Sequence, residues 1–289
     1  MLKKISIGTA NFANRYGFKN ENKFDLNEIT KLKKICNKNN IQKIDTSANY
    51  KYSEKIIGNS NLLDFDITTK ITIDNFSLIS PYQNAKIQLK KSIKKLNIKK
   101  NKINLLIHNP ISLLTPYGKD FYNCLINMKD EYKINKVGIS IYEPDTYINL
   151  SNYINIEIVQ FPLNIFDNRF VKKNFYNILS SRNVIMQARS VFLQGILLYN
   201  LNELPNYFNK WPSVFIKYKK WLMNNKISSL DACINHLKPY HEISSFIFGI
   251  NNTHQLEQII ISAKKNYKII NFNNSKIDSK LIDPRLWNK

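Results

Sequence analysis

Short apolar runs and longer amphipathic stretches alternate along the whole chain of 289 residues. The longer stretches, such as residues 26–39 and 86–99, place apolar residues three or four positions apart, which predicts helices with one buried face. Several of the short runs are continuously apolar, as is typical of parallel strands covered on both faces. Eight such runs occur, in the order KISIG, IQKID, DITTK, INLLIH, KVGIS, IEIVQ, VIMQA and SSFIFG.

Strands in this regular alternation with helices predict the α/β class and, more narrowly, closure into a (β/α)8 TIM barrel rather than an open sheet. The chain length suits one such barrel, and no Pro/Gly/Ser-rich linker or low-complexity tract divides the sequence. We therefore expect a single domain over residues 1–289. The tail from residue 271 is polar and then ends in LIDPRLWN, a short apolar segment that we expect to dock against the barrel.

Two connections are long enough to shape a pocket at the rim of a barrel. The first follows strand one and contains NFANRYGFKNENK, and the second runs from residue 194 to about residue 211, before a helix around Trp221. We expect substrate specificity to lie in such loops. The candidate substrate-contacting residues are Asn11, Arg15, Tyr16 and Phe192, and Arg15 would suit a carboxylate or a phosphate.

The chain has 43 basic and 21 acidic residues, a formal net charge of +22 at pH 7. The basic residues are mostly lysines spread through every segment, whereas a nucleic-acid face favours clustered arginines among aromatic residues. We therefore expect a solvated lysine surface and no nucleic-acid partner, with a basic nucleic-acid binder kept as a minor alternative. An anionic cofactor or substrate would still be attracted to this charge.

Neither a membrane anchor nor a metal centre is expected. No apolar run reaches the length of a membrane span, and the N-terminus enters a strand without the apolar core of a signal peptide. The cysteines, Cys36, Cys124 and Cys233, lie far apart and lack the spacing of a zinc site or a disulfide framework. We expect a cytoplasmic protein without a metal, and the sequence leaves its oligomeric state open.

Ionisable residues stand at the ends of three consecutive predicted strands. Asp45 ends the second strand, Lys70 the third and His108 the fourth, and Tyr50 follows Asp45 in IDTSANYKYSEKIIG. A parallel barrel brings the carboxyl ends of its strands to one rim, where these side chains would meet. Each residue also has a purely structural interpretation, as a helix cap, a packed ring, a solvated strand end or a turn residue before Asn-Pro.

Together the four residues favour acid–base chemistry. An isolated tyrosine has a pKa of about 10 and gives up its proton poorly at neutral pH. A buried ammonium beside the ring would lower that pKa, so Tyr50 would protonate a developing alkoxide as a general acid. Asp45 would keep Lys70 charged and oriented, and a neutral His108 would direct a hydrogen bond to a carbonyl.

The chain resembles the aldo-keto reductases over essentially its whole length, from IGTANF to LIDPRLW. It looks closest to a bacterial subgroup often found with surface-polysaccharide and nucleotide-sugar genes, whose pattern is echoed in KVGISIYEP, IVQFPLNIFDNR and ARSVFLQGILL. The resemblance implies a (β/α)8 barrel that transfers a hydride between NAD(P)H and a small-molecule carbonyl or alcohol, and it slightly favours NADP(H). By this similarity Asp45, Tyr50, Lys70 and His108 match the family's catalytic tetrad, with Tyr50 as the general acid.

The resemblance also implies which residues hold the nicotinamide cofactor. They are Ser140 and Gln160 for the carboxamide, Ser190, Leu193 and Gly195 for the pyrophosphate, Gly249, Asn251 and Thr253 at a helix N-terminus, and Gln255 toward the adenosine end. Structural interpretations stay open here too, with Gln160 as a satisfied polar residue of the barrel and Asn252–Thr253 as a helix cap.

Three positions depart from the family pattern. Lys51 stands where glycine commonly follows the tyrosine, Ile141 where asparagine often follows the serine of strand five, and Arg189 where an aromatic residue often stacks on the nicotinamide. No Arg or Lys stands at the usual clamp for a 2′-phosphate, which leaves the choice between NAD and NADP open. The leading hypothesis is an NAD(P)H-dependent carbonyl reductase for a small polar substrate, with sugar derivatives among the candidates. The alternative is a barrel that binds a ligand or partner without redox turnover.

Overall fold

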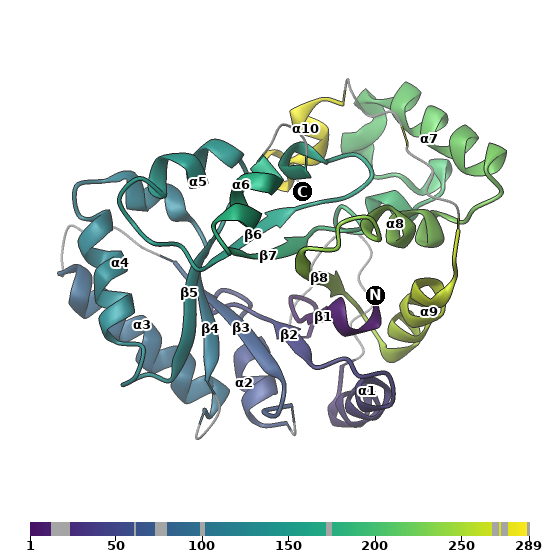
Figure 1. Ribbon diagram of the computed structural model, residues 1–289. Coiled ribbons are helices and arrows are strands. Elements are labelled where there is room, and N and C mark those ends of the chain that lie inside the picture. Colours follow the sequence, from purple (N-terminus) through teal and green to yellow (C-terminus); the bar gives the residue numbers. More distant parts are fainter. Residues whose placement is uncertain are drawn as a thin grey trace.

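The computed structural model describes residues 1–12, 24–60, 62–72, 80–98, 102–171, 175–267, 272 and 277–287. Within this part of the chain, parallel strands close into a barrel in sequence order (Figure 1). The strands are β1 (Ile5–Gly8), β2 (Lys43–Asp45), β3 (Asp66–Ile71), β4 (Ile103–Ile107), β5 (Ile134–Ser140), β6 (Ile158–Pro162), β7 (Ile185–Arg189) and β8 (Ile243–Gly249). Each coincides with one of the predicted apolar runs, so the (β/α)8 fold expected from the sequence is confirmed.

Helices cover the outer side of the barrel, and Figure 1 shows α3 and α4 beside β4 and β5. At least one helix follows every strand, as the alternating pattern predicts. Among the described helices, none is long and apolar enough to cross a membrane. The α-helices are α1 (Leu26–Lys38), α2 (Ser53–Gly58), α3 (Pro81–Leu96), α4 (Gly118–Asn127), α5 (Pro144–Leu150), α6 (Phe175–Ser181), α7 (Pro212–Asn224), α8 (Ser229–Leu237), α9 (Thr253–Lys264) and α10 (Ser279–Ile282).

Capping residues set helix ends that apolar periodicity alone does not locate. The helix predicted over residues 86–99 begins earlier, at Pro81, because the side chain of Ser80 accepts a hydrogen bond from Gln83 N and proline suits the first helical position. It ends at Leu96, since Asn97 takes a left-handed φ of 52°. The first turn of α3 is polar, and the periodic pattern therefore missed it.

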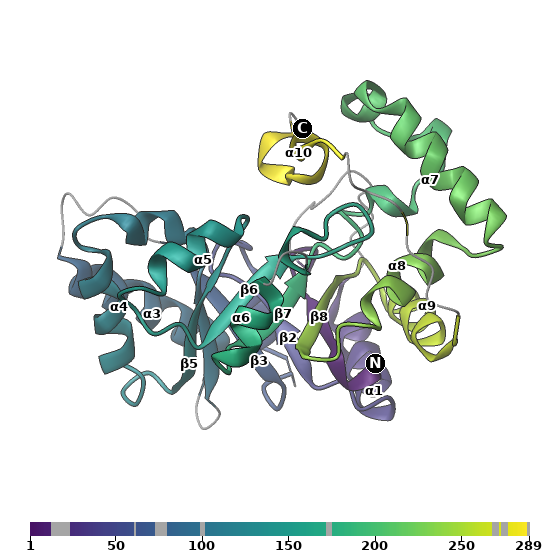
Figure 2. The same cartoon turned by 45° about the horizontal axis from the view of Figure 1, so that its top comes forward.

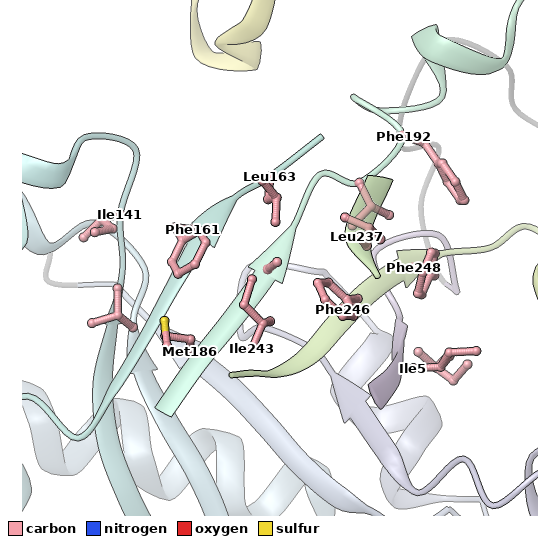
Figure 3. Packing of buried hydrophobic residues seen from close by; sticks show 14 of the residues in the cluster. Ile5, Ile141, Phe161, Leu163, Met186, Phe192, Leu237, Ile243, Phe246 and Phe248 are labelled. Atoms are coloured by element: carbon pink, nitrogen blue, oxygen red, sulfur yellow. The ribbon is translucent and has the colours of Figure 1, made fainter. Parts of the chain in front are cut away.

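The hydrophobic core lies largely between the sheet and its helices. Phe161 of β6 stacks on Phe170 with ring centroids 4.9 Å apart, and Phe170 meets Phe175 of α6 edge-on. Figure 3 shows Phe161, Met186 and Phe246 coming from β6, β7 and β8. Because side chains alternate between the faces of a strand, the polar residues next to these apolar ones point into the barrel. Gln160 and Gln187 therefore lie inside the barrel, where they hydrogen-bond to each other.

The C-terminal segment packs against the connection that follows β7. Trp211 Nε1 donates a hydrogen bond to Asp278 Oδ2 at 3.1 Å, and Tyr207 Oη donates to the carbonyl oxygen of Lys280 at 3.1 Å. The ring of Trp287 lies edge-on to Phe208, with centroids 4.9 Å apart. Figure 2 shows α10 and α7 in the upper part of the view, beyond the carboxyl ends of β6 and β7. Residues 277–287 therefore lie at the rim where the candidate catalytic residues stand.

Candidate active site

Asp45 and Lys70 form a buried ion pair at the carboxyl ends of β2 and β3. Lys70 Nζ lies 2.6 Å from Asp45 Oδ1 and donates a second hydrogen bond to the carbonyl oxygen of Thr46 at 2.9 Å. Burial lowers the pKa of Lys70, the charge and hydrogen bond of Asp45 oppose that shift, and the charge of Arg189 adds to it. Asp45 therefore favours the charged form of a lysine that burial alone would neutralise.

Side-chain hydrogen bonds that cross the barrel hold Asp45 from its other side. Gln160 Nε2 donates to Asp45 Oδ2 at 2.7 Å and to Gln187 Oε1 at 3.1 Å. Gln187 Nε2 in turn donates to Thr68 Oγ1 at 3.2 Å. Both oxygens of the Asp45 carboxylate are thus engaged, which fixes the orientation of the ion pair.

Tyr50 lies beside the ion pair, in the turn between β2 and α2. Its ring centroid is 5.4 Å from Lys70 Nζ and 6.1 Å from the ring of His108, which it meets edge-on. The next residue, Lys51, is exposed and has a φ of 42°, in the left-handed region that favours glycine. The turn that presents Tyr50 therefore needs a left-handed residue, and a lysine adopts this conformation here at a cost of about 1 kcal/mol.

His108 follows β4 directly, and its ring lies next to the ring of Tyr50. Burial and the charges of Lys70 and Arg189 lower the pKa of His108 to about 3, so its ring is neutral at neutral pH. Ser47 Oγ lies 3.2 Å from His108 Nδ1 and 3.3 Å from the carbonyl oxygen of Lys70. The hydroxyl has one proton, so Ser47 donates to Nδ1 only in the tautomer with the ring proton on Nε2, and otherwise accepts from Nδ1–H while donating to the carbonyl oxygen of Lys70. In the first of these tautomers Nε2–H is a hydrogen-bond donor.

A cavity of about 510 Å³ opens next to these residues, a size that suits a small-molecule ligand. Asp45, Tyr50 and His108 line one part of it, and Gln255 and Gln258 of α9 line another. Further lining residues come from the end of β7 and the segment after it, namely Arg189, Ser190, Val191, Phe192, Gln194 and Gly195. Because the lining residues extend from β2 to α9, the cavity suits an extended ligand.

A sequence model of the aldo/keto reductase family matches residues 4–280. The chain belongs to the aldo/keto reductase family. Family membership supports an oxidoreductase that uses a nicotinamide coenzyme and a small carbonyl substrate. The resemblance seen in the sequence is thereby confirmed at the level of the family.

Solved structures of aldo-keto reductases share the fold. A protein from Pseudomonas aeruginosa named as an aldo-keto reductase aligns with a TM-score of 0.64 and 16% identity, over 90% of this chain and 89% of its own. An aldo-keto reductase from Bacillus halodurans, solved in its holo form, aligns with a TM-score of 0.67 and 15% identity, over 91% of this chain and 87% of its own. At such identities the likeness shows the fold. A search of curated proteins gave no match.

Two features of this aldo/keto reductase fit a nicotinamide coenzyme. Gln160 Oε1 is buried and has no hydrogen-bond partner among the described residues, so an acceptor next to the catalytic ion pair is unused. Next to the cavity, the segment after β7 is tightly turned, because Ser190, Leu193, Gln194 and Gly195 all have positive φ. Backbone turns of this kind orient amide groups toward anions such as a pyrophosphate.

The residues that the sequence assigned to ligands fall into two groups. Ser190, Gly195, Gly249, Asn251 and Gln255 line the cavity, and so do the substrate candidates Asn11 and Phe192. Ser140, Gln160, Leu193 and Thr253 are not among its lining residues within the described chain; the first three are buried. Arg15 and Tyr16 lie outside the described residues.

Thr253 contacts α1. Its backbone N–H and its hydroxyl both donate to Glu28 Oε2, at 3.0 and 2.9 Å. Asn252 caps α9, with its side chain accepting from Gln255 N at 3.0 Å, as the structural interpretation of the sequence proposed. The hydrogen bond from Thr253 N is the largest cause that lowers the pKa of Glu28. A charged carboxylate of the chain itself therefore occupies the N-terminus of α9.

Several residues of the site carry no sequence signal that would single them out. Ser47 and Gln187 act through hydrogen bonds to His108 and Gln160. Tyr142 and Tyr199 line the cavity from loops. Their positions depend on tertiary contacts between distant strands. Among the described residues, no group of three or more His, Cys, Asp or Glu side chains is arranged to hold a metal ion.

Proposed function

We propose that this protein is an NAD(P)H-dependent carbonyl reductase, or the reverse alcohol dehydrogenase, in which Tyr50 is the general acid. The observation that carries the proposal is the position of the Tyr50 ring, 5.4 Å from the Nζ of a buried, ion-paired Lys70. Tyr50 and His108 line the same cavity. A phenol, a neighbouring ammonium and a neutral imidazole are the groups that carbonyl reduction needs for proton transfer.

Lys70 prepares Tyr50 to donate its proton. A cation beside a phenol stabilises the phenolate that remains after the proton has left. Asp45 and the Thr46 carbonyl accept two of the three N–H donors of Lys70, which leaves the third available to the phenolate oxygen. The contact with Asp45 also favours the charged form of this buried ammonium.

His108 positions the carbonyl. Its low pKa keeps the ring neutral, and we propose that the tautomer with a proton on Nε2 is the active one, with Ser47 Oγ donating to Nδ1. A hydrogen bond from Nε2–H to the carbonyl oxygen would polarise the C=O bond and turn the oxygen toward Tyr50.

A bound nicotinamide coenzyme would supply the hydride. We assign its carboxamide to Ser140 and Gln160 at the ends of β5 and β6, and the unpartnered Gln160 Oε1 supports that assignment. Its pyrophosphate is assigned to the turned segment from Ser190 to Gly195. Gly249, Asn251 and Gln255 would then face the adenosine end. The sequence resemblance alone slightly favours NADP(H).

The natural substrate is proposed to be small and polar, with sugar derivatives as candidates because the sequence echoes the subgroup associated with surface-polysaccharide genes.

A cytoplasmic location is proposed on the sequence features given above. A nucleic-acid partner is not part of the proposal, since the lysines are spread along the whole chain.

Titration of the protein with NADH and with NADPH, followed by nicotinamide fluorescence, tests the proposal first. Oxidation of the bound coenzyme is then followed with a panel of aldehydes, ketones and keto-sugars. Coenzyme binding with turnover of at least one carbonyl supports the assignment. Binding without turnover across the panel would favour a non-redox barrel, and absence of binding would contradict the coenzyme assignment.

A further inference from the structure

Arg189 brings a positive charge into the wall of the catalytic cavity. It ends β7 and lines the cavity together with Tyr50 and His108. Its charge is one of the causes that lower the pKa values of Lys70 and His108. The charge of the Arg189 guanidinium therefore acts on the candidate catalytic residues at this end of the cavity.

The hydrogen bonds of Arg189 leave this charge without a counterion. Nε donates to Ser140 Oγ at 3.3 Å, Nη1 to Ser190 Oγ at 3.3 Å and Nη2 to the carbonyl oxygen of Ile141 at 3.1 Å. All three acceptors are neutral. A guanidinium has five N–H donors, so one donor on each terminal nitrogen remains, and such a pair binds a carboxylate or phosphate side by side.

The neighbouring acidic groups are already engaged by other cations. Asp283 accepts from Arg285 at 2.6 Å, and Arg169 pairs with Asp167 at 2.9 Å and with Glu143 at 2.6 Å. In the cavity wall, Asp45 is paired with Lys70. Within the described part of the chain, no carboxylate lies within ion-pair distance of Arg189. A partly buried cation of this kind is most stable when a ligand supplies the opposite charge.

Tyr142 holds the guanidinium in place. The guanidinium carbon of Arg189 lies 4.0 Å from the centroid of the Tyr142 ring, and that of Arg285 lies 3.9 Å from the same centroid. Both guanidinium groups therefore lie against the Tyr142 ring. Because Asp283 neutralises Arg285, this stack fixes Arg189 without cancelling its charge.

We propose that Arg189 binds an anionic group of the substrate, a carboxylate or a phosphate carried close to the reducible carbonyl. The inference rests on the proposed function and narrows its substrate class to anionic aldehydes and ketones. A substrate anion suits the position better than the pyrophosphate of a coenzyme, because Arg189 lines the cavity together with Tyr50 and His108. Its Nε also donates to Ser140 Oγ, to which the carboxamide of the coenzyme is assigned. The pyrophosphate of a dinucleotide is separated from its reactive ring by a ribose.

Matched pairs of carbonyl compounds test the proposal and distinguish the two anions. We would compare 4-carboxybenzaldehyde with its methyl ester, and glyceraldehyde 3-phosphate with glyceraldehyde. The expected result is that kcat/KM favours the anionic member of at least one pair by roughly ten- to a hundredfold. Calorimetric titration with the same compounds reports the preference even where turnover is absent.

Three variants test whether Arg189 causes the preference for anionic compounds. Arg189→Met should abolish the preference for the anionic member of a pair, whatever its effect on kcat/KM for the neutral compound, and Arg189→Lys should retain part of that preference because a charge remains without the fork. Arg182→Met is the matched control, since Arg182 is an exposed arginine over the ring of Tyr147 and lies outside the cavity. It should leave the preference unchanged.

Results that contradict the role of Arg189 differ from results that contradict the proposed function. Equal kcat/KM values or affinities within both pairs, or a preference that survives in Arg189→Met, would overturn the assignment. So would a loss of coenzyme affinity in Arg189→Met with the preference intact, because Arg189 would then serve the coenzyme. Failure of the wild type to bind or oxidise NAD(P)H sinks the proposed function instead, and the calorimetric preference still decides whether Arg189 binds anions.

Discussion

Lys70 Nζ and Asp45 Oδ1 lie 2.6 Å apart inside the barrel, with side chains that are 1% and 5% exposed. A buried pair of this kind contributes little net stability compared with apolar residues, but breaking it leaves a charge that nothing compensates. The pair therefore serves the charge state of Lys70, and through it Tyr50, rather than the stability of the barrel.

Asp45→Asn should unfold at lower denaturant, with a loss of about 3–5 kcal/mol, because Lys70 would remain buried without its counterion. The double variant Asp45→Asn/Lys70→Met should recover most of this loss, since it removes the lone charge. Urea unfolding of the wild type and both variants measures the difference. A double variant that is less stable than Asp45→Asn would show that the pair itself stabilises the fold.

Ser47→Ala tests the tautomer of His108. Without the hydroxyl 3.2 Å from Nδ1, the ring proton no longer has a reason to stay on Nε2, and kcat should fall by roughly tenfold. Coenzyme affinity should stay constant, because Ser47 is a positioning residue. The nitrogen chemical shifts of His108 report the tautomer directly, and Ser47→Thr should restore it. An unchanged tautomer in Ser47→Ala would contradict this role.

Glu28→Gln tests whether the carboxylate at the N-terminus of α9 acts on the coenzyme. Its charge repels the 2′-phosphate that distinguishes NADPH from NADH, provided that the adenosine end lies near Gln255. Titration should show the NADPH affinity rising by roughly three- to tenfold relative to NADH. Glu257→Gln is the control, because Glu257 is also acidic and lies on α9 but is 55% exposed. Equal responses of both variants would refute the specific role of Glu28.

The low pKa of His108 predicts a dependence of stability on pH. Because its pKa is about 3 in the folded protein and about 6.5 in an unfolded chain, the unfolded state binds the proton first as pH falls. Below pH 6.5 the free energy of unfolding should therefore drop by about 1.4 kcal/mol per pH unit through this residue. Burial raises the pKa of Glu54, which acts in the opposite direction at lower pH.

Comparison with His108→Gln isolates this contribution. Between pH 6.5 and 5 the stability of the wild type should fall more steeply than that of the variant. Parallel curves would mean that His108 titrates alike in both states. Chemical denaturation at each pH provides the measurement.

The sequence predicted the barrel because parallel strands covered on both faces leave continuous apolar runs. It also brought Asp45, Lys70 and His108 to one rim, since a barrel aligns the carboxyl ends of its strands. The structure places Tyr50 beside them, as expected.

Contacts between segments that are distant in the sequence had no comparable sequence pattern from which they could be predicted. The carboxylate of Glu28 reaches Thr253 across 225 positions, and the ring of Tyr142 contacts arginines from β7 and from the C-terminal tail. Local patterns report which face of an element is buried, but not which distant polar group it will meet. Lys51 combines a feature that the sequence reveals with one that only the structure reveals. Its departure from glycine was visible in the sequence, whereas its left-handed φ required the structure.

The most direct test of the central claim is the turnover and coenzyme affinity of Tyr50→Phe, measured with the best carbonyl substrate found for the wild type. We expect kcat to fall by at least about a hundredfold, while the dissociation constant of the coenzyme stays within about twofold. Activity equal to that of the wild type in Tyr50→Phe would contradict the assignment of Tyr50 as the general acid.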